Sequence, residues 1–237
     1  MRYFWMSLGA VFVKDLVTEL RARQVLPTMI VLGMLIVWVL RIACEAAAGS
    51  TAVIGPVAFW IAFLFSGILA QERSFATEQQ HDCIYGLLLA PIDAGTIYLA
   101  KLLVNVVMLC IFEVIVVPVV IVAFNLRVGA GWPGLIVVLL LGNVAISSVG
   151  TLFSAIVQLC RTRGSLLSIL VLVVLAPVMV PATFALLLMF GAIPAELVGT
   201  GALAFVGTFK AAVGYMVAFD VVFVTASWLL FGFAIKE

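Results

Sequence analysis

The sequence predicts an all-α integral membrane protein with six transmembrane helices. Of its 237 residues, 66% are hydrophobic and only 10% are charged, and the mean hydropathy is +1.37. A soluble domain is about 45–50% apolar and about 25% charged. Six stretches approach or exceed the length of about 20 mostly apolar residues that a spanning helix needs. We therefore expect a single transmembrane domain over residues 1–237.

The expected spans cover residues 25–44, 53–71, 102–124, 134–157, 166–190 and 212–234. With the N-terminus in the cytoplasm, most lysines and arginines fall on the inner side: Arg2, Lys14, Arg21, Arg23, Arg73, Lys101, Arg161, Arg163 and Lys236. The outer side then holds Arg41, Arg127 and Lys210. The positive-inside rule places both ends of the chain in the cytoplasm.

Residues 1–24 predict a helix that lies in the membrane interface. An apolar stripe at helical spacing runs through residues 4–22, with polar residues on the opposite side; the apolar members are Trp5, Leu8, Phe12, Leu16 and Leu20. Amphipathic helices of this kind lie in the interface and do not cross it. No signal peptide is expected, because charged residues interrupt the segment, and the first span would serve as its own insertion signal.

The longest polar interruption runs from Gln71 to Lys101 and is expected in the cytoplasm. It contains acidic residues, followed by a short apolar run that stops at Pro91. Such a segment is typical of a docking surface for a partner, but a solvated loop with one buried edge explains it equally well.

Two features near the C-terminus predict irregular structure. Pro177 and Pro181 lie inside the fifth span, where each removes a backbone donor, so that helix is expected to kink or break. The apolar stretch from Ile193 to about Phe209 is interrupted by glycines and is short for a span, which indicates a re-entrant or interfacial element on the outer side.

Few polar side chains fall within the spans. The charged ones are Arg41, Glu113 and Asp220, and we expect Arg41 to pair with Asp220 in the outer half of the membrane. Glu113 must face protein or water, because a charge in hydrocarbon is costly. It is either a proton or substrate contact or a hydrogen-bond partner of a neighbouring helix, through Asn105, Asn143 or Thr151.

A stripe of small polar residues follows one face of the fourth span: Asn143, Ser147, Thr151, Ser154 and Gln158. Such residues let helices approach closely and hydrogen-bond across the interface. The stripe therefore serves helix packing or lines a pathway.

Several kinds of chemistry are not expected of this chain. It has no G-x-x-x-x-G-K-[ST] loop, so ATP with its Mg²⁺ would have to bind to a partner. Its one histidine, His81, lies outside the spans, and no catalytic, metal or haem-ligating set can be built around it. Its four cysteines are far apart and are expected to be small buried hydrophobes. The net charge of +1 argues against nucleic acid.

Several segments, in order along nearly the whole chain, resemble the CcmB family, also called haem exporter protein B. They include KDLVTELR (14–21), GPVAFWIAFL (55–64), LAQERSF (69–75), GLLLAP (86–91) and RTRGSLLSILVL (161–172). The chain departs from the family pattern at Cys83, Tyr85 and Val173.

The resemblance implies an ABC-2-like permease subunit of the bacterial inner membrane that acts in c-type cytochrome biogenesis. Its implied partners are a CcmA-like ATPase that binds ATP, CcmC-like and CcmD-like membrane subunits and the haem chaperone CcmE, with a second copy of this chain as a further candidate. The complex, and not this chain alone, would handle haem and release the loaded chaperone. Within this frame, ATPase coupling is assigned to residues 71–101, at Glu72, Arg73, Glu78, Asp82, Leu87, Leu88, Leu89 and Pro91.

Three other functions compete with this one. The first is a permease of another ABC-2-type exporter, for lipid, polysaccharide or drug, which neighbouring genes would discriminate. The second is an intramembrane enzyme, which lacks support because the spans hold no nucleophile–base pair or metal cluster. The third is a structural assembly subunit without a transport path.

Overall fold

A computed structural model describes residues 2–22, 24–80, 94–127, 131–159, 165–192 and 207–234, and these residues form helices and parts of the turns that flank them. The helices are α1 (Arg2–Ala22), α2 (Val25–Ala46), α3 (Thr51–Gln80), α5 (Ala94–Ala123), α6 (Trp132–Leu159), α7 (Ser165–Met189) and α8 (Phe209–Ala234). Every helix except α1 is long and apolar enough to cross a membrane, which gives six spans within the described residues. Helices suit a bilayer because they satisfy their own backbone hydrogen bonds. The all-α, six-span prediction is confirmed.

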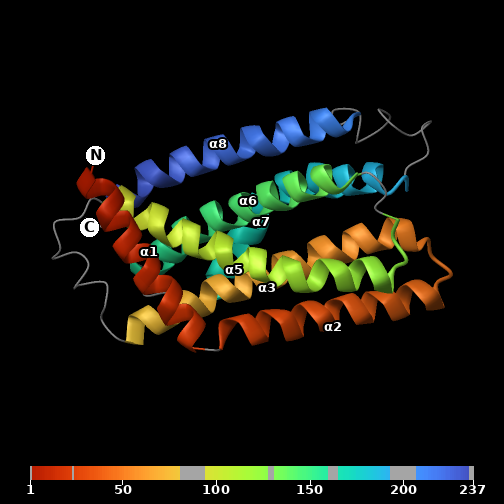
Figure 1. The fold of residues 1–237 in the computed structure, drawn as a ribbon, viewed down its shortest axis with the longest axis horizontal. Coiled ribbons are helices and arrows are strands. Elements are labelled where there is room, and N and C mark those ends of the chain that lie inside the picture. Colours follow the sequence, from red (N-terminus) through yellow and green to blue (C-terminus); the bar gives the residue numbers. More distant parts are fainter. Residues whose placement is uncertain are drawn as a thin grey trace.

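The six long helices run side by side, and α1 crosses them at one end of the bundle (Figure 1). The C-terminal end of α8 lies at that same end, while the turn from α2 to α3 lies at the opposite end (Figure 1). This arrangement agrees with an even number of spans and with both ends of the chain on one side. We call the end that carries α1 the cytoplasmic end, following the distribution of lysine and arginine.

The predicted spans agree with the helices to within a few residues, except on either side of the polar segment. There α3 continues past residue 71 to Gln80, and α5 begins at Ala94, well before residue 102. The two outer parts of the segment 71–101 are therefore extensions of membrane helices. The middle of the segment, 81–93, lies outside the described residues.

Irregular structure was predicted for the fifth span and for the stretch that follows it. Helix α7 runs without interruption through Pro177 and Pro181, so a break at these prolines is wrong. Helices α3 and α5 likewise continue through Pro56 and Pro118. A bundle tolerates such prolines because neighbouring groups can satisfy the freed carbonyls. The predicted re-entrant element lies mostly outside the described residues, and Phe209 already begins α8.

Three helices end at the outer face in the same way. A residue with positive φ follows each of them: Ala48 (47°) after α2, Asn125 (55°) after α5 and Gly191 (62°) after α7. In each case the next amide donates to a carbonyl five residues back, at 2.9 Å, as in a Schellman motif. The motif turns the chain tightly and gives hydrogen bonds to carbonyls at the helix end that would otherwise have no donor.

Helix α6 is the centre of the bundle and packs against α3, α5, α7 and α8. In an 18-residue stretch of its span 72% of the residues are buried, against 17% in such a stretch of α8. Glycines allow this close packing: a Cβ on Gly142 would lie 2.5 Å from Cη2 of Trp60, and one on Gly150 would lie 2.7 Å from Cδ of Gln71. Small residues at helix contacts are the usual means of close approach in membranes.

Helix α1 packs mainly against α5. It buries Val11 against the bundle and leaves other apolar side chains exposed, namely Phe4, Trp5, Met6, Val13, Val17 and Leu20. This exposed apolar surface fits a helix that lies in the membrane interface, as the sequence predicts.

Candidate functional site

The residues predicted to couple to an ATPase lie on α3 and in the segment after it. Glu72 is half-buried, and Ser168 of α7 donates a hydrogen bond to its Oε1. Arg73 and Glu78 lie on the extension of α3, but the structure describes only their backbone. Asp82, Leu87, Leu88, Leu89 and Pro91 lie outside the described residues, so their coupling role stays a prediction.

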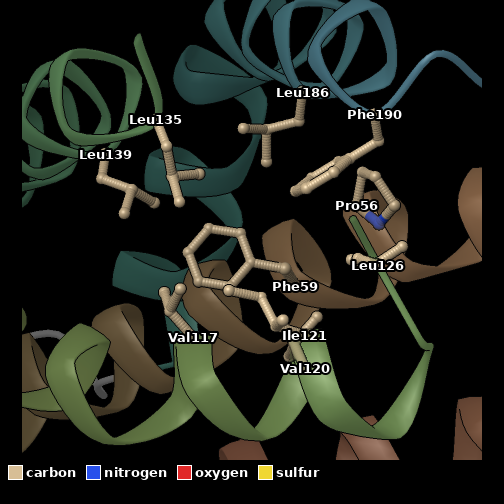
Figure 2. Close-up of a pocket in the computed structure, with 10 residues that line it drawn as sticks. All are labelled: Pro56, Phe59, Val117, Val120, Ile121, Leu126, Leu135, Leu139, Leu186 and Phe190. Atoms are coloured by element: carbon tan, nitrogen blue, oxygen red, sulfur yellow. The ribbon is translucent and has the colours of Figure 1, made fainter. Parts of the chain in front are cut away.

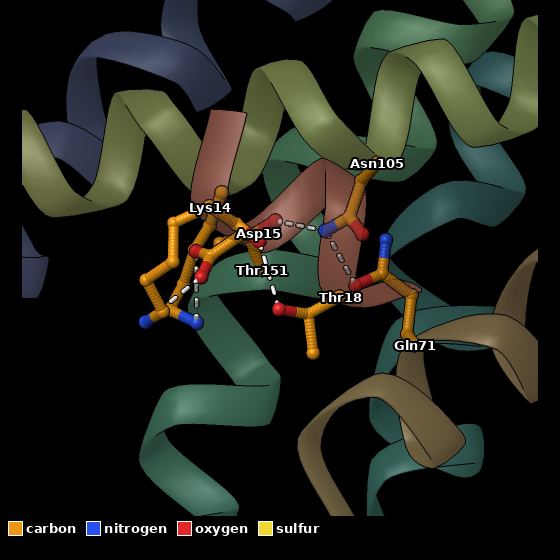
Figure 3. A network of polar contacts seen from close by, with 7 residues as sticks. Lys14, Asp15, Thr18, Gln71, Asn105 and Thr151 are labelled. Carbon is orange, nitrogen blue, oxygen red and sulfur yellow. Dashed lines mark hydrogen bonds and ion pairs between the residues drawn. The ribbon is translucent and has the colours of Figure 1, made fainter. Parts of the chain in front are cut away.

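A network of polar contacts joins four helices just inside this extension (Figure 3). The side-chain amide of Asn105 on α5 donates to Oε1 of Gln71 on α3 at 3.0 Å and to Oγ1 of Thr151 on α6 at 2.9 Å. Nearby, Asp15 on α1 lies 3.1 Å from Nζ of Lys14 and 3.8 Å from Nζ of Lys101 on α5. We call these six residues the cytoplasmic polar network.

The network fixes the base of the α3 extension. Gln71 is 2% exposed and its side chain packs against Gly150 of α6. A buried amide that loses its hydrogen bonds is costly, so Gln71 holds α3 at one height and rotation against α5 and α6. Sequence reasoning counted Gln71 with the docking segment, but its side chain belongs to the helical bundle.

A second polar contact lies deeper in the membrane, between α5 and α6. The amide nitrogen of Asn143 donates to Oε2 of Glu113 at 2.8 Å and lies 3.2 Å from Sγ of Cys110. This confirms the interhelical hydrogen bond expected for Glu113, with Asn143 as the partner. Asn105 and Thr151, the other candidates, bond to each other instead.

The members of the small-polar stripe on α6 differ in their contacts, and the side chain of Gln158 lies outside the described residues. Asn143 and Thr151 hydrogen-bond across helix interfaces. Ser154 instead bonds to carbonyls of its own helix, at Gly150 and Thr151. Ser147 is buried and its hydroxyl has no partner among the described residues. The contacts of Asn143, Thr151 and Ser154 are those of helix packing.

The expected pair between Arg41 and Asp220 is wrong. Nε of Arg41 donates to the carbonyl of Ala123 at 2.5 Å, and its Nη2 lies 2.5 Å from Oε1 of Glu45, one turn along α2. Such local partners are within easy reach. Asp220 lies near the middle of α8, deeper than Arg41, which is five residues from the outer end of α2, and its carboxyl has no partner among the described residues. Depth in the membrane separates the two residues.

The outer half of the bundle has a pocket whose lining is entirely apolar (Figure 2). It lies between α3, α5, α6 and α7 and leaves a small cavity of about 20 Å³ that is partly open to the surroundings. The lining residues are Pro56, Phe59, Val117, Val120, Ile121, Leu126, Leu135, Leu139, Leu186 and Phe190. This lining offers no side chain that could ligate haem iron or pair with a haem propionate.

Among the described residues no group of three or more His, Cys, Asp or Glu could hold a metal ion. Within the same residues, Cys44 and Cys110 are free thiols.

The comparison with protein families adds the decisive observation. The family model described as CcmB protein matches residues 6–219, which is nearly the whole chain. The chain belongs to the CcmB family. A search of curated proteins finds no match. As a CcmB-family protein, the chain is a permease subunit of an ABC-type haem exporter in cytochrome c maturation, and it belongs to a complex with partner subunits.

The family match covers every helix from most of α1 to the middle of α8, including the cytoplasmic polar network. In this CcmB-family chain, sequence reasoning missed Asp15 and Lys101 as a contact between α1 and α5. One signal was available, because a lysine at the start of an apolar span needs an anion or water near the interface.

Proposed function

We propose that this chain is the transmembrane subunit through which a CcmA-like ATPase drives the release of the haem-loaded chaperone CcmE. The single observation that carries the proposal is the continuity of α3. The helix runs from Thr51 to Gln80, while its membrane-spanning part ends at Glu72. At 1.5 Å per residue, α3 extends about 12 Å beyond the span.

A rigid extension of a spanning helix can act as a lever. Helices transmit displacement because they are stiff along their axis, and α3 has no break between Gln71 and the outer turn before Thr51. A partner that displaces the tip of α3 therefore displaces its membrane part as well. The cytoplasmic polar network is where that displacement reaches α5 and α6, through Asn105 and Thr151.

The proposed docking site comprises the tip of the lever and the residues that follow it in the sequence. Glu78 and Asp82 supply carboxylates for charge-assisted hydrogen bonds with basic groups of the ATPase. Leu87, Leu88 and Leu89 supply apolar anchors, which carry more binding energy at an interface than rim charges do. The chain itself binds no ATP in this mechanism; ATP and Mg²⁺ bind to the partner, and CcmC-like and CcmD-like subunits complete the assembly in the bacterial inner membrane.

The test is to replace Leu88 or Leu89 with Asp in the full complex, with Leu88→Met as the matched control. The Asp variants should release the ATPase from membranes and stop cytochrome c production, because a buried carboxylate without a partner disrupts an apolar contact. Glu78→Gln should weaken production more mildly. ATPase retention is measured on washed membranes with an antibody, and cytochrome c by haem staining.

Two results would contradict the proposal. One is that the Asp variants keep the ATPase bound and mature cytochrome c normally. The other is that a tag on this chain purifies an ATPase of a different exporter and no cytochrome c maturation subunits, which would favour a lipid, polysaccharide or drug exporter.

A further inference from the structure

The contact between Glu113 and Asn143 leaves two buried oxygens without a hydrogen bond. Glu113 is 6% exposed and Asn143 is fully buried. Asn143 donates its amide to Oε2 of Glu113. Oε1 of Glu113 and Oδ1 of Asn143 have no partner among the described residues. Buried polar atoms are nearly always satisfied, so this pair of orphans needs an explanation.

A single proton would give both unpaired oxygens a hydrogen bond. An ionised carboxylate and an amide oxygen are both acceptors, and neither can bond to the other. A neutral carboxyl carries an O–H donor. If the proton sits on Oε1 of Glu113, it can be donated to Oδ1 of Asn143, and the two side chains then exchange two parallel hydrogen bonds. The terminal torsions of Glu and Asn are broad, so both planar groups can turn into line.

The surroundings offer no described cation that would favour the ionised form. Besides the hydrogen bond between its two members, the pair has one further polar contact among the described residues, from the amide of Asn143 to Sγ of Cys110. Helix α7 has no ionisable residue between Ser168 and Met189. The charged or titratable residues of the other packed helices include Lys14, Asp15, Arg41, Glu72, Lys101, Lys210 and Asp220, and none is in hydrogen-bond or ion-pair contact with Glu113.

We propose that Glu113 and Asn143 form a proton-binding site in the middle of the membrane, with the proton on Oε1 of Glu113 and donated to Oδ1 of Asn143. The bound proton adds a second hydrogen bond between α5 and α6 to the one that the Asn143 amide donates. Loss of the proton would leave a carboxylate oxygen facing an amide oxygen in a site without water. Because both are acceptors, they would repel each other and push the two helices apart. The site is a proton-dependent latch between α5 and α6, and it does not depend on which ATPase binds the chain.

Infrared spectroscopy of the full complex in lipid nanodiscs tests the proton directly. The C=O stretch of a neutral carboxyl should be present in the wild type and absent from Glu113→Gln. Asp220→Asn, which removes another buried carboxyl, is the matched control and should keep the Glu113 band. Asn143→Leu should move the band to higher frequency, because the amide N–H no longer bonds to the carboxyl C=O.

Protein accumulation and thermal stability give the second readout. Glu113→Gln should accumulate and melt as the wild type does, because its amide replaces the proton as donor to Asn143 while its oxygen still accepts. Glu113→Leu should melt at a lower temperature. The proposal is overturned if no carboxyl band disappears in Glu113→Gln, if Asn143→Leu leaves the band in place, or if Glu113→Gln fails to accumulate. These measurements need neither ATP nor chaperone release. A negative result would therefore contradict the proton-binding site and leave the proposed coupling mechanism untouched.

Discussion

Helices α3, α5 and α6 meet through different kinds of contact at the two ends of the bundle. At the cytoplasmic end, Gln71, Asn105 and Thr151 hydrogen-bond across α3, α5 and α6, and Asp15 and Lys101 pair α1 with α5. At the outer end the same three spans and α7 meet around an apolar pocket near Phe59. Apolar contacts between helices have little directional preference, whereas a hydrogen bond fixes both height and rotation.

The difference indicates where the bundle is stiff and where it can adjust. In a bilayer, lipid tails are as apolar as the helix surfaces, so apolar packing gives little resistance to small shifts. A displacement that enters at the cytoplasmic extension of α3 would therefore be transmitted through the polar network and absorbed around the pocket. Three changes test this contrast, and they are taken from the largest expected effect to the smallest.

Adding one methyl group at the cytoplasmic end should have the largest effect. A Cβ on Gly150 would lie 2.7 Å from Cδ of the buried Gln71, so Gly150→Ala must displace the side chain that Asn105 holds. Overpacking of this kind costs about 1–3 kcal/mol. For a chain of this size, each kcal/mol lowers the melting temperature by about 2–4 °C, which thermal unfolding in detergent can follow.

Two other glycines serve as controls for that change. At the outer end, a Cβ on Gly134 would lie 3.0 Å from the tip of the Phe209 ring, which can tilt, so Gly134→Ala should cost less. On α8, nothing lies within 4 Å of the Cβ position of Gly214, and Gly214→Ala should be neutral or stabilising. An equal loss of stability at Gly134 and Gly150 would contradict the contrast between the two ends.

Removing the central amide of the network should have an intermediate effect. Asn105→Leu deletes the donor to Gln71 and Thr151 and leaves Oε1 of Gln71 buried without a partner. Interhelical hydrogen bonds in membrane proteins contribute about 0.6 kcal/mol on average and at most about 1.7. We therefore expect a loss of about 1–2 kcal/mol, together with reduced cytochrome c production while the ATPase stays bound.

A double-mutant cycle separates the hydrogen bond from general packing. If Asn105 acts through Gln71, the double variant Asn105→Leu/Gln71→Leu should lose less free energy of unfolding than the two single variants lose together. Strict additivity of the two would show that Asn105 acts elsewhere. Loss of ATPase binding in Asn105→Leu would place the residue at the docking surface instead of in the transmission path.

Filling the pocket at the outer end should have the smallest effect on stability. Val117→Ile adds one methyl group to the lining (Figure 2). Cavity filling typically stabilises by about 0.5–2 kcal/mol, and less is expected here because the pocket is partly open. If the outer half must adjust during the cycle, cytochrome c production should fall although the melting temperature does not. A variant with unchanged stability and unchanged production would show that the pocket takes no part in the cycle.

The amino-acid sequence by itself determined the membrane-spanning architecture. Apolar runs such as those of α6 and α7 are long enough to identify a span without any partner, because the bilayer sets one required length and polarity. The predicted end of α3 and the predicted start of α5 lay too close to the membrane. Composition indicates where the apolar, lipid-facing part of a helix stops, but the helix itself can continue beyond that point. The family motifs pointed to CcmB, and the match over residues 6–219 confirmed them.

Only the tertiary structure decided which polar side chains meet. Glu113 had three candidate partners in the sequence, and depth and helix rotation selected Asn143. The same two quantities separated Arg41 from Asp220 and brought Gln71 to Asn105. Sequence reports the order of residues along a helix and roughly their depth. The rotation of one helix against another follows from the packing of all its neighbours, as at Gly142 against Trp60, and no single segment contains it.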